Sequence, residues 1–344
     1  MFKVFIAEKI LRDIILAESR RPIKERSDLF KILKTAKNLY VAMDATDTEW
    51  IKQLKKEYRL VADTTRTAYI KKIPANPETV LKNPSSLFLL DIPFAEAKKI
   101  QKEYGVMCLS GTDPNITPLI DIYDEHTTDK GEPLSRGWDA VLDSVEQTPS
   151  NALILTDRYL FKTTNPRYGN GFDNIRSILN ELLPRELNTN YHVTVIFDKD
   201  NIDALYDFQT IAKRLNNIKE EFKRPYPITM EVLGISGKND TYHDLHNRRI
   251  VSNYFVVKMD YKLAAFNKNV GTVDQTIIPQ VLFTQESLNG RSSAPLKSMN
   301  QIVSALRDFS NSLSSPRTNH NSYYYAVDGQ WMEKCFAIRN RLIK

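Results

Sequence analysis

The stretch YHDLHNRRIVSNYFVV, residues 242–257, places two of the chain's five histidines and two adjacent arginines directly before an apolar run. The β-branched and aromatic residues of that run, from Ile250 to Val257, predict a strand. No other segment brings so many side chains with acid, base or phosphate-binding chemistry so close together in the sequence. We therefore expect the fold and chemistry of the second half to depend on this stretch.

The sequence before this stretch alternates between apolar runs and amphipathic segments. Three buried-type strands are predicted at residues 151–155, 192–197 and 228–234, with helices at 172–183 and 202–222 between them. After the stretch we expect a strand at 276–283, a helix at 296–313 and a short basic helix at 331–343. This order predicts a second α/β domain.

The first half of the chain shows the same alternation. Strands are predicted at residues 3–7, 38–43, 60–62, 86–90 and 106–109, with helical periodicity between most of them. A β-α-β order favours a parallel sheet. Because Pro149 and Ser150 interrupt the pattern, the sequence predicts an α/β protein with two three-layer domains, residues 1–149 and 150–344.

The positive charge of the chain is unevenly distributed. Residues 1–150 contain 23 Lys and Arg and 23 Asp and Glu, whereas residues 151–344 contain 25 Lys and Arg and 19 Asp and Glu. The whole net charge of +6 therefore belongs to the second half. Such asymmetry indicates a polyanionic partner for that half, such as DNA or RNA. The alternative is an ordinary solvated surface.

Several features indicate a cytoplasmic protein without a membrane partner. The apolar run after Met1 is too short for a signal peptide and is closed by charged residues. No stretch approaches the ~20 apolar residues of a membrane span. The two cysteines, Cys108 and Cys335, are far apart and lack the spacing of a metal site, so we expect inert buried thiols in a reducing compartment.

The element order of residues 150–285, with His-x-basic leading into a strand, resembles the phospholipase D-like fold. Active members of that family carry His-x-Lys-x4-Asp: one histidine attacks phosphorus, a second protonates the leaving group, and the lysine offsets phosphate charge. His246, Arg248 and Asn253 occupy the matching positions. The acid is replaced by an amide, the Gly/Ser-rich continuation is absent, and only one such motif exists.

The resemblance therefore implies a degenerate domain in the second half, and three roles stay open for it. One is an inactive scaffold, in which His246 and Arg248 only bind the ends of neighbouring strands. Another is phosphate or nucleic-acid binding without chemistry, because arginine can bind phosphate bidentately. The third is a working, metal-independent phosphodiesterase that uses His246 and Arg248, with Asn253 in the place of the acid.

A set of aspartates follows the predicted strands of the first half: Asp44, Asp63, Asp91 and Asp113. Ligands gather at the carboxyl edge of a parallel sheet. Carboxylates that converge there can hold Mg²⁺, as metal-dependent nucleases of the PIN type do. Acids also follow strands because they cap the next helix, which is the alternative. Mg²⁺ is the only cofactor that the sequence suggests.

The C-terminal tail mixes aromatic and basic residues. Aromatic rings can stack on bases while cations meet the phosphates. The cations that we expect to bind nucleic acid are Arg248, Arg249, Lys258, Arg339 and Arg341. In the alternative, Trp331, Phe336 and Ile338 anchor a C-terminal helix on the core.

Taken with the charge, these motifs predict a protein that binds or processes nucleic acid. Its first domain would be Rossmann-like, and its carboxylates would supply any catalysis more readily than His246. A nuclease-like domain beside an inactive phosphodiesterase-like one is reminiscent of bacterial defence and toxin modules, by analogy at the level of the fold. The rival prediction is a non-enzymatic scaffold whose tail docks a protein partner. No phosphate-binding glycine motif is present.

Overall fold

The computed structural model contains two compact units, formed by Met1–Asp121 with Leu282–Asn300 and by Ile122–Val281 with Gln301–Lys344. The structure describes residues 2–36, 39–43, 49–57, 60–61, 63–112, 114–120, 125–128, 136–162, 171–236, 248–261, 263, 266, 275–289, 294–313, 323–333 and 337–344. The boundary expected at residues 149 and 150 lies inside the second unit. Residues 122–148 also belong to the second unit, because His126–Thr128 pairs with its sheet.

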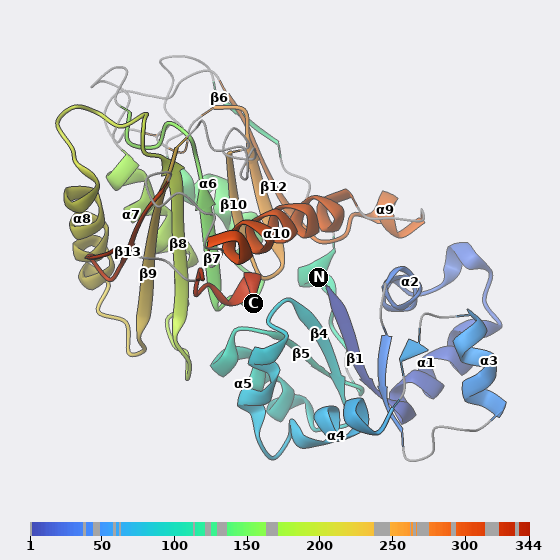
Figure 1. The fold of residues 1–344 in the computed structure, drawn as a ribbon. Helices are drawn as coiled ribbons and strands as arrows, with labels where there is room; N and C mark the ends of the chain where they lie inside the picture. Colours follow the sequence, from blue (N-terminus) through green and yellow to red (C-terminus); the bar gives the residue numbers. More distant parts are fainter. Residues whose placement is uncertain are drawn as a thin grey trace. The chain divides into compact units, whose positions relative to one another are not determined.

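The first unit is built on a parallel five-stranded sheet with the order β3-β2-β1-β4-β5. Its strands are β1 (Lys3–Ala7), β2 (Leu39–Ala42), β3 (Leu60–Val61), β4 (Ser86–Leu90) and β5 (Met107–Ser110). Its helices are α1 (Glu8–Ser19), α2 (Asp28–Thr35), α3 (Glu49–Glu57), α4 (Thr64–Lys72), α5 (Phe94–Tyr104) and α9 (Gln285–Asn289), with 3-10 turns η1 (Ile23–Glu25), η2 (Pro77–Lys82) and η3 (Thr117–Leu119). The predicted parallel sheet is confirmed (Figure 1).

Local chemistry defines the ends of these helices. The Ser27 hydroxyl accepts a hydrogen bond from the Phe30 amide at 3.3 Å, as an N-cap of α2. Gly105, with φ of 59°, ends α5 in the left-handed conformation that glycine adopts without strain. Between the helices, the rings of Phe5 and Phe88 stack at 5.0 Å in the core of the sheet.

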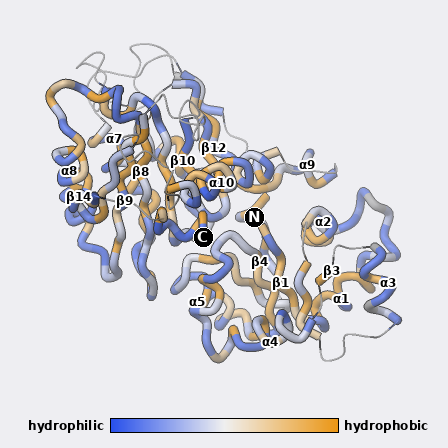
Figure 2. Tube along the Cα trace, in the orientation of Figure 1, coloured by the Kyte–Doolittle hydropathy of each residue, from blue (hydrophilic) through white to orange (hydrophobic). Residues whose placement is uncertain are grey.

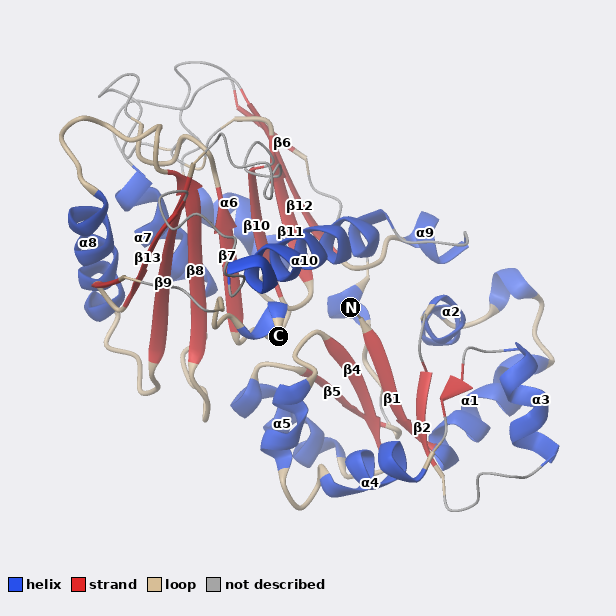
Figure 3. Ribbon diagram, in the orientation of Figure 1, coloured by secondary structure: helices blue, strands red, loops and turns tan. Residues whose placement is uncertain are grey.

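The second unit is built on a mixed nine-stranded sheet with the order β14-β13-β9-β8-β7-β10-β11-β12-β6. The central strands β7, β8 and β9 are parallel, and the other pairs are antiparallel (Figure 3). The strands are β6 (His126–Thr128), β7 (Ala152–Thr156), β8 (Tyr191–Asp198), β9 (Ile228–Ile235), β10 (Arg248–Ser252), β11 (Phe255–Met259), β12 (Gln275–Val281), β13 (Tyr323–Val327) and β14 (Gln330–Met332). The predicted α/β class is confirmed.

Helices cover both faces of this sheet. Those on one face are α6 (Trp138–Leu142), α7 (Gly171–Leu182) and α8 (Phe208–Glu221) (Figure 1). The part of α10 (Ala294–Leu313) that belongs to this unit, from Gln301 onward, crosses the other face (Figure 1). The described residues of the unit also form the 3-10 turns η4 (Asp143–Val145) and η8 (Arg341–Ile343). None of the helices in the described ranges is long and apolar enough to cross a membrane.

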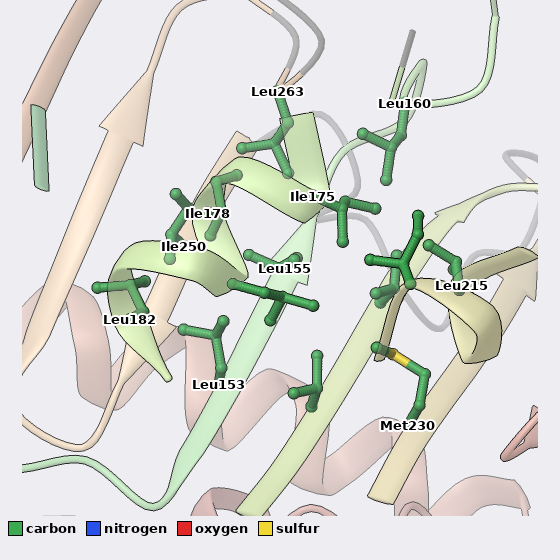
Figure 4. Packing of buried hydrophobic residues seen from close by; sticks show 14 of the residues in the cluster. Leu153, Leu155, Leu160, Ile175, Ile178, Leu182, Leu215, Met230, Ile250 and Leu263 are labelled. Carbon is green, nitrogen blue, oxygen red and sulfur yellow. The ribbon is translucent and has the colours of Figure 1, made fainter. Parts of the chain in front are cut away.

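The core of the second unit lies between the sheet and the helices α6 to α8. Leu153 and Leu155 of β7 face Ile175 and Ile178 of α7 in this cluster (Figure 4). All four side chains are fully buried, and each buried aliphatic side chain contributes about 1.5–3 kcal/mol relative to an exposed one. The hydropathy of the trace follows the same division, hydrophobic along the strands and hydrophilic over helices such as α3 (Figure 2).

The predicted C-terminal helix at 331–343 is wrong. Gln330–Met332 is strand β14, which forms a hairpin with β13, and η8 is the only helical turn in the described part of residues 331–343. The turn consists of Asp328 and Gly329, whose positive φ angles of 49° and 76° are typical of two-residue hairpin turns. Strand β13 pairs with β14 on one side and, on the other side, with β9, which lies far away in the sequence.

Candidate functional site

Charged and aromatic side chains gather where β7, β8 and β9 end and β10 begins. The register places Thr156 beside both Ile196 and Arg249, and Arg248 beside Met259, so these chain ends lie at one edge of the sheet. We call this edge the carboxyl rim, formed by Asp157, Arg158, Tyr159, Lys162, Asp198, Lys199, Arg248 and Asp260. Ligands of α/β proteins bind outside the carboxyl ends of parallel strands.

Arg248 is held at the rim from two sides. Its Nη1 donates a hydrogen bond to the Asp260 carbonyl oxygen at 2.8 Å. Its Nε lies 3.8 Å from Oδ1 of Asp157, a carboxylate with no solvent exposure. Asp157 itself accepts hydrogen bonds from the amides of Tyr159 and Leu263. The guanidinium is therefore oriented by groups that the strands and their loops hold in place.

Arg158, which follows β7, forms a second ion pair at the rim, with Asp198 at the end of the neighbouring strand β8. Its Nε donates to Oδ2 of the fully buried Asp198 at 3.1 Å. Asp198 also accepts from Asn201 Nδ2 at 2.7 Å and from the Asp200 amide at 2.9 Å. Buried carboxylates at the ends of β7 and β8 thus each position one arginine, whose side chain keeps 19–23% exposure to solvent.

The ring of Tyr159 lies among three cations of the rim. The guanidinium carbons of Arg158 and Arg248 are 5.3 and 6.0 Å from the ring centroid, and Lys162 Nζ is 5.7 Å from it. Cations attract the face of an aromatic ring at such distances. The ring is partly exposed and Lys162 is exposed. Positive charge and an aromatic surface are therefore presented together at this edge.

Two further cations, Arg249 and Lys258, lie directly opposite each other on β10 and β11. Like charges in this arrangement destabilise a sheet. Burial lowers the pKa of Lys258, and the positive charge of Arg249 lowers it further. A bound anion would relieve this repulsion. The structure thus places Arg248, Arg249 and Lys258, three of the five predicted nucleic-acid ligands, at neighbouring register positions of β10 and β11. Arg249 and Lys258 share one face of the sheet, and Arg248 lies on the opposite face.

Arg339 and Arg341 lie elsewhere in the unit. The carbonyl of Arg339 is hydrogen-bonded to His192 Nδ1 near the start of β8, at 3.0 Å, and Arg341 Nη2 donates to Thr189 Oγ1 at 3.1 Å. About 20 Å of strand separates the start of β8 from the rim at its end. Burial lowers the pKa of Arg341 to about 10. These two arginines therefore do not share a surface with Arg248.

Asn253 has a structural role, because it is hydrogen-bonded to the chain at the start of β7. Its Oδ1 accepts from the amides of Asn151 and Ala152 at 3.0 and 3.2 Å, and its Nδ2 donates to Asn151 Oδ1 at 3.0 Å. It is fully buried in the turn after β10, at the far end of that strand from Arg248. His246 lies outside the described residues.

The two described members of the predicted Mg²⁺ set, Asp63 and Asp91, have other partners in the first unit. Asp63 caps α4 by accepting from the Arg66 amide at 2.7 Å, and Asp91 pairs with Lys9 at 3.6 Å. Asp44 and Asp113 lie outside the described part of the chain. Across the ranges that the structure describes, no three His, Cys, Asp or Glu side chains are grouped closely enough to hold a metal ion. Burial raises the pKa of Cys108 to about 12, so this thiol is a poor nucleophile.

Sequence reasoning missed the two buried carboxylates of the rim, Asp157 and Asp198, and their arginine and tyrosine neighbours. The signal was present, because each aspartate directly follows an apolar strand, as Asp91 does in the first half. It also missed Glu231, an acid inside the apolar strand β9 that is fully buried.

In comparisons with known proteins, no family model matches this sequence, and no curated protein matches it.

Proposed function

We propose that the second unit binds nucleic acid at the carboxyl rim. The observation that carries this proposal is the group of three cations around the partly exposed ring of Tyr159. Arginines oriented by buried carboxylates can meet phosphate oxygens with two parallel hydrogen bonds. The excess positive charge of residues 151–344 supports the same partner.

The topology supports a degenerate phospholipase D-like fold for this unit. His-x-Arg leads into β10, which pairs antiparallel with both β7 and β11, and β7, β8 and β9 are joined by the helices α7 and α8. In the first unit, the order β3-β2-β1-β4-β5 supports a Rossmann-like fold. A place in a bacterial defence or toxin system rests on the analogy between this combination of domains and such systems.

We propose binding rather than cleavage at the rim. In active members of the phospholipase D-like family, the third residue of the motif is an acid. Here the amide of Asn253 is fully buried, and both its oxygen and its nitrogen are hydrogen-bonded to Asn151. Catalysis in that family also requires a pair of histidines, whereas the sequence carries one such motif.

The proposal is tested by measuring the affinity of the purified protein for short single- and double-stranded DNA and RNA at two salt concentrations. Cleavage is scored in the same samples, with Mg²⁺ and with chelator. We expect affinity to fall steeply with salt, because neutralised phosphates release counterions, and we expect intact nucleic acid. Absence of binding at low salt would exclude the proposal and favour a protein-docking scaffold. Cleavage without Mg²⁺ that His246→Ala abolishes would support a phosphodiesterase instead.

A further inference from the structure

Two exposed aromatic side chains lie on the hairpin at the edge of the nine-stranded sheet. Tyr324 of β13 is 40% exposed and Trp331 of β14 is 55% exposed. Trp331 is opposite Ala326, and Tyr324 precedes Ala326 by two residues, so all three side chains point to the same face. Ala326 is part of the core beneath α6 to α8. Both aromatic rings therefore lie on the α8 face of the sheet.

Tyr324 is fixed in place next to a cation of the rim. Its ring packs against Phe208 of α8 at 5.4 Å, and Lys199 Nζ is 4.7 Å from its centroid. Lys199 follows β8 and pairs with Asp200 at 3.4 Å. Tyr324 is opposite Gly234, where a Cβ would lie 3.2 Å from the Lys199 Cβ. The missing side chain at Gly234 thus leaves room for the lysine stem beside the ring.

The hairpin that carries Trp331 packs against α8. The turn before it packs on α8, because a Cβ on Gly329 would lie 3.1 Å from Cβ of Asn216 and 3.6 Å from Cα of Lys213. The side chain of Lys213 is exposed. The hairpin therefore packs against α8 and holds the exposed indole on the same face of the sheet as Tyr324. Tryptophan and tyrosine are enriched at binding interfaces.

We infer that Tyr324 and Trp331 are stacking platforms that make the carboxyl rim a site for single-stranded nucleic acid. This inference rests on the proposed function and adds the form of the substrate. Unpaired bases offer their faces to aromatic side chains, whereas the bases of a duplex are already stacked inside it. Three strand spacings, about 14 Å, separate β7, which leads to Tyr159, from β13, and four spacings, about 19 Å, separate it from β14, which carries Trp331. A strand of a few nucleotides spans that width.

The first test compares Trp331→Ala and Tyr324→Ala with the matched control Met332→Ala. Met332 is 36% exposed and follows Trp331 on β14, so its side chain points to the opposite face. We expect each aromatic variant to bind single strands roughly 5- to 150-fold more weakly. Duplex affinity and the salt dependence of binding stay unchanged, since no charge is removed. The control binds as the wild type does.

A second measurement reports on Trp331 directly through its fluorescence. The chain has three tryptophans; Trp138 is buried, and the Arg12 guanidinium covers Trp50 at 4.1 Å from its ring. Single-stranded nucleic acid should therefore protect the emission from acrylamide quenching, and Trp331→Phe should remove most of that protection.

The outcomes separate the two proposals. Salt-sensitive binding that both aromatic variants retain in full would overturn the stacking inference and leave binding at the rim intact. Equal losses for single strands and duplexes would also overturn it, because stacking acts on unpaired bases only. Absence of any binding by the wild-type protein at low salt would overturn both.

Discussion

The two ends of the parallel strands β7 to β9 carry similar residue types that are used differently. At the carboxyl rim, arginines are held by buried carboxylates and keep part of their surface in solvent. Toward the amino ends, the chain from Ile338 to Lys344 is bound to the sheet by buried polar groups. A basic residue in the sequence therefore indicates a binding function only when its burial and its partners in the fold are also known.

Glu231 is the centre of the buried polar group near the amino ends. Its carboxylate accepts hydrogen bonds from Tyr325 Oη and the Arg339 amide, both at 2.6 Å, and from Thr194 Oγ1 at 3.0 Å. Burial raises the pKa of Glu231, and the bond from Tyr325 opposes that shift. Asn340 Nδ2 extends the group by donating to Thr194 Oγ1 and to the Leu153 carbonyl. This arrangement holds the C-terminal segment in place.

The largest effect is expected for Glu231→Ala. Three donors lose their acceptor in a buried site, which should lower the free energy of unfolding by about 3–5 kcal/mol. Chemical denaturation measures the change, with Glu231→Gln as the control that keeps an acceptor oxygen. A loss below about 1 kcal/mol would mean that the C-terminal segment is held by its apolar contacts instead.

The next effect is a pH dependence from His192. Burial, together with the charge of Arg341, lowers its pKa to about 4 from an ordinary value of 6.5. Below pH 6.5 the unfolded chain binds a proton that the folded chain does not, so stability falls as the pH drops from 6.5 toward 4 and levels off below it. We expect a loss of roughly 3 kcal/mol over this window.

Unfolding at a series of pH values measures this effect, and His192→Gln should remove the part of the slope between pH 6.5 and 4. The same slope in the variant would assign the pH dependence to other groups. The eight residues of the carboxyl rim include no histidine. We therefore expect none of them to add a similar contribution to the pH dependence of stability.

A smaller effect is expected for Asn253→Asp. The new carboxylate still accepts from the amides of Asn151 and Ala152, but it cannot donate to Asn151 Oδ1. The unfavourable contact and the buried charge should cost about 1–3 kcal/mol. The substitution restores the acid of the resemblance, yet we expect no phosphodiesterase activity. Activity in this variant, measured with a chromogenic phosphodiester, would contradict the structural role of Asn253.

Much of the fold was predictable because its signals are local. The apolar runs at residues 86–90, 151–155 and 192–197 predicted β4, β7 and β8, and their separation by helices predicted parallel pairing. The β13–β14 hairpin carried a local signal too, Asp328-Gly329 between two apolar runs, but residues 331–343 were interpreted as a short basic helix. The pairing of β13 with β9, on the inner side of the hairpin, depends on residues far away in the sequence.

The site was less predictable, because its geometry depends on contacts between distant segments. A basic residue before a strand predicted a functional position for Arg248, but its partner Asp157 comes from another strand. In contrast, Arg339 and Arg341 looked equally suitable by composition. Only the fold shows that their backbone and side chains bind Glu231, His192 and Thr189.

The most direct test of binding at the carboxyl rim replaces either of two exposed lysines by alanine. One lysine lies at the rim, and the other lies in the C-terminal segment, toward the amino ends of β7 to β9. Lys162→Ala removes a cation beside Tyr159 at the rim, and Lys344→Ala removes the same charge from the exposed C-terminal residue. Affinity for a short single strand is measured over a range of salt concentrations. We predict that Lys162→Ala reduces the slope of log affinity against log salt by about 0.7, the value for one phosphate contact, and that Lys344→Ala leaves it unchanged. Equal slopes in the two variants would contradict binding at the carboxyl rim.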